Sequence, residues 1–427
     1  MLINKYIFKM AWRNITRNKR RTALSVIAIM LAVMIVCFAQ SYVEGLLGSM
    51  KSNVFRFQTG HIKILNKNYL KEQKLMPLDL NIYGYSNDYR EVMQTVKTVA
   101  GVKTVLPRTK FIGMVNMKGK MKYINGFALD AEREKNVLPL ADNIIKGRMF
   151  RNFNPDTVAQ EMVMSAGLAY ELDLQTGDKI TLMAKDAHEG LTLMDFKIAG
   201  LVSFGVAEYD SIYFYIPLST AARFLKMPFS VMELTVFLKD TADSMPLASV
   251  INKKIKRHPA APFQAYPWEK QENGRYGKMF AMYDVLIPII YFVFLFLASL
   301  VIINTTMMVV YERMREIGTI AAMGMRGNRI IQLFFYEAVI ISIIGSLSGT
   351  LAGGSLAYIF SITGIDFSKF SGGMSGFPIT DIVYFEFTPG LLVFSFLFGI
   401  VVASLFSFIP SSKAARLEPV KALKGVF

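Results

Sequence analysis

Four long apolar runs constrain this chain more than any other feature of its sequence. The first, Thr22–Val43, contains no charged residue, and Val285–Tyr311 is uncharged as well. A third run, about Ile330–Ile362, is interrupted only by Glu337, and a fourth covers Leu391–Ile409. Because an α-helix needs about 20 apolar residues to cross a hydrocarbon core about 30 Å thick, each run predicts one membrane-spanning helix.

The rest of the chain is too polar to lie in the bilayer. Although 53% of the 427 residues are hydrophobic, 19% are charged, and one long stretch separates the first two runs. Alternation of apolar and polar residues there predicts strands at His61–Leu65, Lys122–Phe127, Lys179–Met183, Phe196–Val202, Ile212–Ile216 and Glu233–Leu238, with helices after Asp88 and over Met245–Arg257. The predicted fold class is a polytopic α-helical membrane protein, with four transmembrane helices and a large α+β extracytoplasmic domain.

Positive charge is concentrated in short segments beside the apolar runs. The formal net charge is +16, and Lys and Arg cluster before residue 22, between residues 312 and 329, and in the C-terminal tail. Because short loops rich in Lys and Arg stay in the cytoplasm, both termini are expected inside and the large domain outside. The charge is therefore a topology signal, and no nucleic-acid partner is expected. Apolar and basic residues at helical spacing before residue 22 also predict an amphipathic helix along the cytoplasmic membrane surface.

No catalytic, cofactor-binding or metal site is expected in this chain. Its three histidines, His61, His188 and His258, have no ligand spacing, and the single cysteine, Cys37, lies in the first apolar run. The P-loop pattern GxxxxGK[ST] does not occur, and the apolar runs carry no series of acids for proton-driven transport. The chain is therefore not expected to be an enzyme. Uphill transport would need a partner that hydrolyses ATP.

Small residues recur every four positions in the last two runs. The third contains Gly345, Gly349 and Gly353, and the fourth contains Ser395, Gly399 and Ala403. Small side chains on one face let two helix backbones approach closely in a membrane. The rows have two interpretations: packing of the third span on the fourth within one chain, or contact with a second permease subunit.

Two segments carry a family resemblance. The stretch Tyr311–Gly324 reads YERMREIGTIAAMG, and the tail Ala414–Leu423 reads AARLEPVKAL. Both resemble signature motifs of the type VII ABC permease superfamily, which contains macrolide exporters, lipoprotein-release permeases and a cell-division permease. The stretch Thr59–Ile64 is most similar to the lipoprotein-release branch. This resemblance implies a porter-like subdomain, residues 46–125 and 230–275, interrupted by a β-rich insertion, residues 126–229.

The resemblance also implies partners and working residues. A short helix after the second span would seat in a groove of a cytoplasmic ABC ATPase dimer, which would bind ATP and Mg²⁺. A second permease subunit, identical or paralogous, would complete the complex. The residues assigned to ATPase coupling are Glu312, Arg313, Arg315, Glu316, Gly318 and Gly324. Those assigned to a possible substrate cavity, between the first and second spans of paired permeases, are Phe38, Phe292 and Phe296.

The implied function is a mechanotransmission transporter that releases lipoproteins from the cytoplasmic membrane toward the outer membrane. Two alternatives remain: an efflux permease for amphiphilic drugs or peptides, and a signal relay of the cell-division type that transports nothing. Permeases that recruit a periplasmic lipoprotein carrier have a long, proline-containing hook. The matching stretch, Lys185–Asp195, is short and has no proline, so docking of a carrier is not expected.

The predicted organisation is that of a multi-pass inner-membrane protein. Its segments are a cytoplasmic amphipathic helix (1–21), transmembrane helix 1 (22–45), a periplasmic domain (46–283), transmembrane helix 2 (284–311), a cytoplasmic coupling helix (312–329), transmembrane helix 3 (330–362), an extracytoplasmic loop (363–388), transmembrane helix 4 (389–410) and a cytoplasmic tail (411–427).

Overall fold

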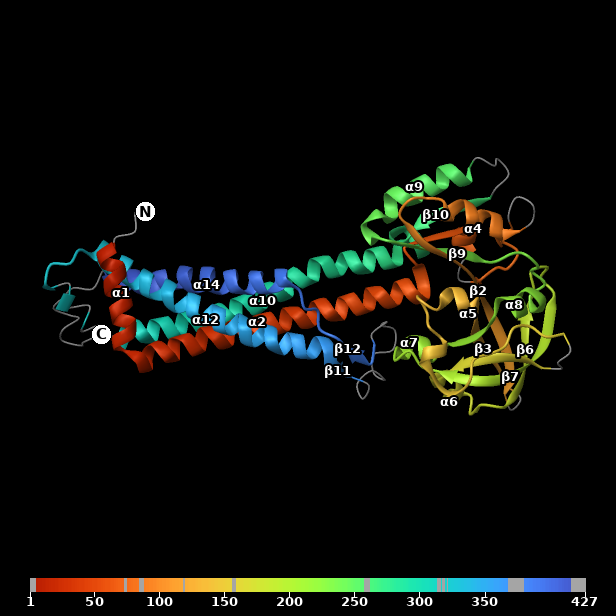
Figure 1. The fold of residues 1–427 in the computed structure, drawn as a ribbon, viewed down its shortest axis with the longest axis horizontal. Helices are drawn as coiled ribbons and strands as arrows, with labels where there is room; N and C mark the ends of the chain where they lie inside the picture. Colours follow the sequence, from red (N-terminus) through yellow and green to blue (C-terminus); the bar gives the residue numbers. More distant parts are fainter. Residues whose placement is uncertain are drawn as a thin grey trace. The chain divides into compact units, whose positions relative to one another are not determined.

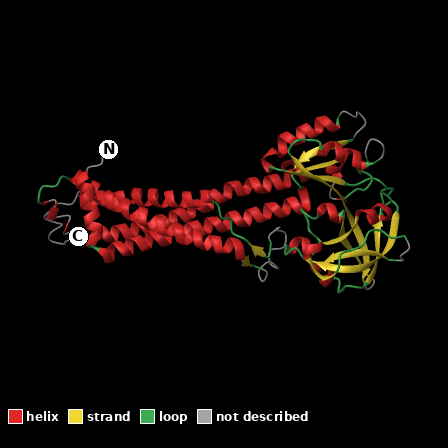
Figure 2. Ribbon diagram, in the orientation of Figure 1, coloured by secondary structure: helices red, strands yellow, loops and turns green. Residues whose placement is uncertain are grey.

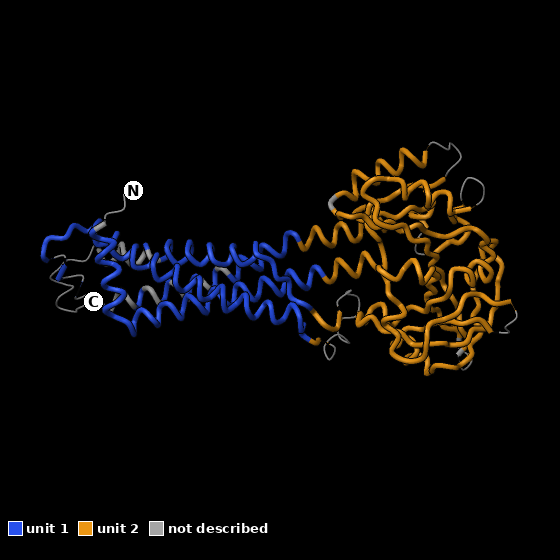
Figure 3. The backbone as a smooth tube through the Cα atoms, in the orientation of Figure 1, with its two compact units in different colours: residues 1–48, 284–365, 384–427 blue, residues 49–283, 366–383 orange. Residues whose placement is uncertain are grey.

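The chain divides into two compact units (Figure 3). The computed structural model describes residues 5–72, 75–83, 88–117, 120–155, 159–256, 262–312, 316, 319–320, 322–367 and 380–415. Unit 1 contains residues 1–48, 284–365 and 384–427, and unit 2 contains residues 49–283 and 366–383.

Unit 1 is helical. Its helices are α1 (Lys5–Arg17), α2 (Lys19–Asn53), α10 (Arg275–Glu312), α12 (Gly327–Thr363) and α14 (Pro389–Ala415), of which α2 and α10 end and begin in unit 2 (Figure 1). Among the described residues, 4 helices are long and apolar enough to cross a membrane. They correspond to the four apolar runs, so the predicted membrane architecture is confirmed.

Helix α1 is amphipathic, as predicted, and part of its apolar surface is covered by protein, whereas Tyr6 and Trp12 are exposed. Ile7, Ala11 and Ile15 are buried in one cluster with Leu333 and Ile340 of α12. Burial of these three side chains stabilises α1, because a helix this short has only marginal stability in isolation.

The single acid of the third apolar run also holds α1 in place. Glu337 is 6% exposed, and its Oε1 accepts a hydrogen bond of 2.6 Å from Asn14 Nδ2 of α1. A charge in this environment is tolerated when polar groups satisfy it. Glu337 therefore has a packing role between two helices of unit 1.

The helices α2 and α10 are longer than the apolar runs that predicted them. They contain 35 and 38 residues, or about 52 and 57 Å at 1.5 Å per residue. A hydrocarbon core is about 30 Å thick, so each helix continues well beyond any bilayer it crosses. The extensions include polar residues with good helix propensity, such as Glu44 and Lys51 in α2, which hydropathy alone does not assign to a helix.

Unit 2 is built around one 10-stranded sheet (Figure 2). Its strands are β1 (Ile62–Asn66), β2 (Val102–Met117), β3 (Lys120–Leu129), β4 (Ile144–Gly147), β5 (Gln160–Ser165), β6 (Lys179–Lys185), β7 (Leu191–Val202), β8 (Tyr213–Pro217), β9 (Glu233–Leu238) and β10 (Phe263–Pro267). The order is β10-β1-β9-β2-β3-β8-β5-β7-β4, with β6 against β2 and β7. The pairs β3–β8 and β5–β7 are parallel. All six predicted strands are present, whereas β2, β4, β5 and β10 were not predicted.

Two helices cover one part of this sheet. Helix α4 (Tyr89–Lys97) begins where predicted, since Asp88 accepts a hydrogen bond from the N–H of Arg90, and α9 (Ser244–Ile255) matches the other predicted helix. Both pack on β1, β9 and β10 through a buried aliphatic cluster. A second cluster lies among β2, β3, β5, β6, β7 and β8 and includes the short helices α6 (Ala166–Glu171) and α8 (Leu218–Phe224).

The long strand β2 joins the two parts of the sheet. Its first half pairs with β9, and its second half pairs with β3 and β6. The predicted boundary between residues 125 and 126 falls inside β3, so it does not coincide with the end of an element. The two parts have separate aliphatic clusters but share one continuous sheet.

Candidate functional site

The segment assigned to ATPase coupling follows α10. Glu312 is the last residue of α10, whereas Arg313, Arg315 and Gly318 lie outside the described residues. Glu316 Oε1 lies 3.8 Å from Arg17 Nη2 of α1, and both side chains are substantially exposed. Such a pair contributes little stability because water screens it.

Gly324 ends this segment in a left-handed conformation with φ of 92°. A Cβ there would meet no atom within 4 Å. Glycine is favoured at this position because of the backbone angle, and not because a side chain would lack space. The role of these residues in coupling stays a prediction.

The glycine row of α12 contacts α2. A Cβ at Gly345 would lie 2.9 Å from Ile29 Cβ, one at Gly349 2.6 Å from the Met30 carbonyl oxygen, and one at Gly353 2.9 Å from the Met34 carbonyl oxygen. These distances leave no room for a side chain, so the two backbones are in direct contact. This row therefore packs the third span on the first, whereas Gly354 of the same helix lies against Leu392 of α14, so the third span also packs on the fourth.

The small residues of α14 also lie inside unit 1. Gly399 contacts Ser346 of α12 and Val33 of α2, and Ala403 is buried in a cluster with Ile29 and Val33. Ser395 is fully buried, and its Oγ donates to the Leu391 carbonyl oxygen. Within the described residues, all six small residues thus pack inside one chain.

The three phenylalanines assigned to a substrate cavity belong to two different sets of ring contacts. Phe38 packs on the rings of Phe360 and Phe385, with centroids 5.8 and 4.9 Å away. Phe292 and Phe296 stack on each other and are 67% and 52% exposed. A cavity of only about 10 Å³ lies among Val36, Ala39, Gln40, Tyr291, Phe294 and Phe394. This volume holds about one water molecule. Because the substrate cavity is expected between paired permeases, the role of these phenylalanines stays a prediction.

The stretch compared with the hook is a tight hairpin between β6 and β7. Asp186 accepts hydrogen bonds of 2.9 Å from the N–H groups of His188 and Gly190, and it lies 2.7 Å from Lys226 Nζ. An aspartate that caps its own turn is a common device for closing a short loop. The loop is short, as the sequence indicated.

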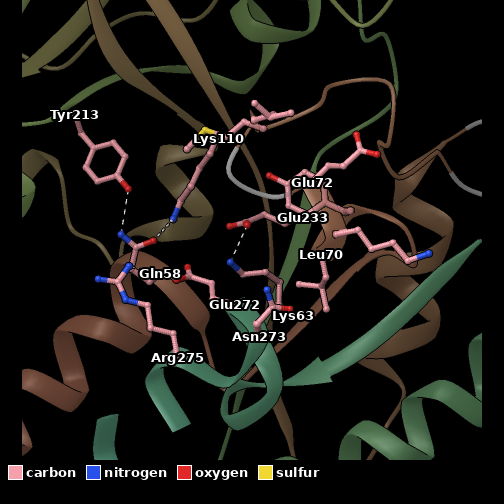
Figure 4. A pocket seen from close by; sticks show the side chains of 14 residues that line it. Gln58, Lys63, Leu70, Glu72, Lys110, Tyr213, Glu233, Glu272, Asn273 and Arg275 are labelled. Atoms are coloured by element: carbon pink, nitrogen blue, oxygen red, sulfur yellow. Dashed lines mark hydrogen bonds and ion pairs between the residues drawn. The ribbon is translucent and has the colours of Figure 1, made fainter. Parts of the chain in front are cut away.

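A pocket of about 410 Å³ in unit 2 was not predicted (Figure 4). Its lining residues come from the helical segment η1 (Val54–Thr59), from strands β1, β2, β8 and β9, and from the short helix α3 (Tyr69–Glu72) with the loop after it. The segment η5 (Trp268–Gly274) and the first residue of α10 complete the lining. They are Gln58, Lys63, Tyr69, Leu70, Lys71, Glu72, Leu75, Met76, Lys110, Tyr213, Glu233, Glu272, Asn273 and Arg275.

The floor of the pocket carries buried charge. Lys63 and Glu233 are 3% and 4% exposed and form an ion pair of 2.9 Å. Lys110 Nζ donates to the Phe57 carbonyl oxygen at 2.5 Å and to Gln58 Oε1 at 3.1 Å, and Gln58 Nε2 donates to the Tyr213 hydroxyl. Burial lowers the pKa of both lysines, while the Glu233 carboxylate raises it.

A second buried ion pair lies behind the pocket. Arg108 is fully buried and holds Glu134 of α5 (Ala131–Glu134) through two hydrogen bonds of 2.6 and 2.9 Å. Its Nη1 also donates to the Arg56 carbonyl oxygen at 2.8 Å. Arg108 and Lys110 of β2 therefore satisfy two of the last carbonyl groups where α2 and η1 end, which is where cations are favoured.

A sequence signal for this cluster did exist. Lys63, Arg108, Lys110 and Glu233 stand inside strands at positions where the neighbouring residues are buried. Charged residues on the buried side of a strand indicate either an ion-pair network or a site. The signal was missed because β2 itself was not predicted.

The fold and these contacts define a class of protein: a polytopic membrane protein whose first two long helices, α2 and α10, carry a large α+β domain. The profile of the MacB-like periplasmic core domain matches residues 22–253, and that of the FtsX-like permease C-terminal matches residues 288–419. The chain therefore belongs to the superfamily of MacB-like and FtsX-like ABC transporter permeases.

Several relatives are similar over most of the chain. The macrolide export ATP-binding/permease protein MacB of Escherichia coli is 24% identical over 427 residues, covering 97% of this chain and 60% of MacB. An uncharacterized ABC transporter permease of Methanocaldococcus jannaschii is 19% identical and is covered over 98% of both chains. A probable syringafactin export ATP-binding/permease protein of Pseudomonas syringae is 27% identical over 212 residues, covering 49% of this chain and 30% of that protein.

The chain spans between about a third and three fifths of the length of the MacB relatives it matches, with 32% of the Agrobacterium fabrum protein and 60% of the Escherichia coli protein covered. Among solved structures, the periplasmic region of MacB from Actinobacillus actinomycetemcomitans is 16% identical, covers 52% of this chain and 94% of that region, and has a TM-score of 0.34.

Proposed function

We propose that this chain is the permease subunit of an ATP-driven ABC transporter that works by mechanotransmission. One observation carries the proposal. Helices α2 and α10 each run without a break from unit 1 into unit 2. Helix α2 contains no proline and keeps its backbone hydrogen bonds along its whole length, whereas Pro288 removes one backbone hydrogen bond from α10. A displacement at one end of α2 would therefore move the other end.

The ends of these two helices are anchored together inside unit 2. Phe55 of η1 packs on Trp268 of η5 with ring centroids 5.4 Å apart, and Lys51 Nζ lies 5.3 Å from the centre of the Trp268 ring. Arg108 and Lys110 tie the end of η1 to the sheet. Movement of α2 or α10 would therefore be transmitted to unit 2 rather than absorbed by a flexible linker.

The energy source in this proposal is a separate ATPase dimer. It would bind ATP and Mg²⁺ and would press on the segment Glu312–Gly324, which lies between two membrane helices and contains both signs of charge. A second permease subunit, identical or paralogous, would pair with this one. The termini would lie in the cytoplasm and unit 2 in the periplasm.

We propose a lipid-anchored protein as the cargo, released from the membrane without a docked periplasmic carrier. The tight β6–β7 hairpin supports the absence of a carrier-recruiting hook. The same hairpin, with the macrolide and syringafactin export relatives, also favours a second candidate, efflux of amphiphilic drugs or peptides.

Deletion of Glu312–Gly318 tests the coupling role. The complex with its ATPase is expected to lose transport in reconstituted vesicles, because the ATPase would no longer push on the permease. A matched control keeps the full permease and inactivates the catalytic carboxylate of the ATPase, which should also stop transport. Transport at the undeleted rate after the deletion would overturn the proposed coupling segment.

Site-specific photocrosslinking separates the two kinds of cargo. A photoreactive residue at Phe38 or Phe292 is expected to capture a lipidated polypeptide in growing cells, and mass spectrometry identifies the captured species. Capture of amphiphilic small molecules or peptides with no lipidated protein would replace lipoprotein release by efflux. Capture of a wall-hydrolase regulator on unit 2, without cargo, would favour a signal relay instead.

A further inference from the structure

The pocket of unit 2 lies where both long helices enter the domain. Gln58 belongs to η1, which continues α2, and Glu272 and Asn273 belong to η5, which leads into α10. Strands β1, β2 and β9 supply Lys63, Lys110 and Glu233 (Figure 4). A ligand in this pocket would contact both helix ends at once.

The two buried lysines have donor groups that the protein does not use. An ammonium group has three N–H donors. Lys110 Nζ has two acceptors, the Phe57 carbonyl oxygen and Gln58 Oε1, and Lys63 Nζ has one, Glu233. Among the described residues, the remaining donors of these lysines have no protein acceptor, and both lysines line the pocket. Their buried N–H groups are available to a ligand.

The buried charge is also out of balance. Lys63, Lys110 and Arg108 are cations, while Glu233 and Glu134 are the anions that pair with them. One positive charge is left over in a region with little water, where an uncompensated charge is costly. At the mouth, Lys71 and Arg275 face Glu72 and Glu272, so the mouth adds no net charge. The floor therefore favours an anion over a cation.

The mouth of the pocket is apolar on one side, and its backbone contains left-handed residues. Leu70, Leu75 and Met76 line it, and Leu75 is 73% exposed. Met76, Glu272 and Asn273 have φ of 46°, 47° and 55°, which is left-handed backbone that non-glycine residues rarely adopt. Such conformations gather at ligand clamps, because the surrounding structure must hold them.

We propose that this pocket binds an amphiphile through an anionic headgroup, a carboxylate or a phosphate, held by Lys63 and Lys110. Its apolar chain would lie along Leu70, Leu75 and Met76. The inference rests on the proposed function for the source of such a molecule, which is the membrane or the cargo. Because Lys110 also holds the last turn before β1 through Phe57, occupation of the pocket reaches the end of α2 directly.

Photolabelling of the full-length chain in nanodiscs tests the proposal. The probe is a fatty acid with a diazirine in its chain, and labelled peptides are mapped by mass spectrometry. Saturable labelling is expected in the peptides that contain residues 58–76 or 272–275. Octyl phosphate should compete, whereas the probe's matched amine and alcohol should label these peptides weakly. Equal labelling by the amine or the alcohol would overturn the anionic headgroup.

Inorganic phosphate distinguishes a free anion from a headgroup. It should compete far less well than octyl phosphate, because it has no chain to cover Leu75 and Met76. Equal competition by both would show that the pocket recognises an anion alone, and would overturn the assignment of an amphiphile. Labelling confined to the membrane helices would overturn the site itself.

Two variants act in opposite directions. Lys110→Met should weaken binding about tenfold or more, since it removes a charge-assisted hydrogen bond. Glu72→Lys, at an exposed position of the mouth, should strengthen binding by about threefold to tenfold through the added positive charge. A gain in affinity cannot result from misfolding, so Glu72→Lys tests binding of an anionic headgroup even if Lys110→Met fails to fold. Unchanged affinity in Glu72→Lys would overturn the proposal.

The matched control is Glu132→Lys, the same charge change at an exposed residue outside the pocket, and it should leave binding unchanged. An equal gain in Glu132→Lys would show a general effect of net charge and would overturn the site. These assays need neither ATP nor the ATPase. If the probe does not bind but transport is normal, the pocket inference is wrong and the proposed function stands. If the probe binds but the deletion in the coupling segment leaves transport unchanged, the proposed function is wrong and the pocket inference stands.

Discussion

At the scale of single residues, His61 links the stability of unit 2 to pH. Its Nδ1 accepts a hydrogen bond of 2.9 Å from the N–H of Leu238, which requires that nitrogen to be unprotonated. Burial, with the charge of Lys103 nearby, lowers the pKa of His61 from 6.5 to about 4. Below pH 6.5 the unfolded chain takes up a proton that the folded chain takes up only near pH 4. The contribution of His61 is therefore complete above pH 6.5 and is lost as the pH falls toward 4.

We expect His61→Gln to make the protein less sensitive to acid. Glutamine can still accept the Leu238 N–H through its side-chain oxygen, but it does not titrate. Because His61 is only half-buried, solvent screening reduces the effect to about 1 kcal/mol, or about 2–4 °C in the melting temperature between pH 7 and pH 5. The control is His188→Gln in an exposed turn. Equal loss of melting temperature on acidification in His61→Gln and in the native chain would contradict this account.

At the scale of elements, the row Gly345, Gly349 and Gly353 decides how closely α12 approaches α2. The spacing of four residues puts the row on one face of α12. That face meets the backbone of α2 near Met30 and Met34. Side chains at these positions would push the helices apart and would remove the dispersion contacts that hold them together in a membrane.

We expect Gly349→Ala to destabilise unit 1 by about 1–3 kcal/mol, the usual cost of overpacking. The same change at Gly48, an exposed residue of α2 whose added Cβ would meet nothing within 4 Å, should be neutral or stabilising by up to about 1 kcal/mol, because alanine favours a helix. Melting temperatures of both variants in detergent give the comparison. An unchanged melting temperature in Gly349→Ala would argue against the α2–α12 contact.

At the scale of the whole molecule, the continuity of α2 and α10 is the feature on which force transmission depends. Both helices continue across the boundary of the two units, which falls after Gly48 and before Asp284, and α10 contains Pro288 shortly after it. A flexible insertion at such a boundary should separate ATP hydrolysis from transport without affecting the packing of either unit.

Three glycines inserted after Gly48 are therefore expected to uncouple the transporter. Glycine breaks a helix because it costs about 1 kcal/mol per residue relative to alanine. Transport by the reconstituted complex should fall about tenfold or more, while ATP hydrolysis stays within about twofold of the native rate. The same insertion after Asn152, in an exposed loop, should change neither, since surface loops tolerate added length. Normal transport with the insertion in α2 would rule out a rigid helical link.

The sequence supported more of the fold than of the site. Uncharged runs and period-two alternation are local properties of a chain, so they identified the membrane helices and six strands. Strand β2 was missed because Lys103, Arg108 and Lys110 interrupt its alternation, two of them with buried charges. Strand β10 was missed because Gln264 and Pro267 weaken the pattern of a short element.

The sequence by itself determined the four spans, the α+β domain between the first two, the family motifs and the row of glycines in α12. Only the tertiary structure decided that this row meets α2, that Phe38 packs on the ring of Phe360, and that Lys63, Lys110 and Glu233 share one pocket. The physical reason is distance along the chain. Periodicity shows which side of an element is apolar, small or charged, but long-range packing decides which two sides meet.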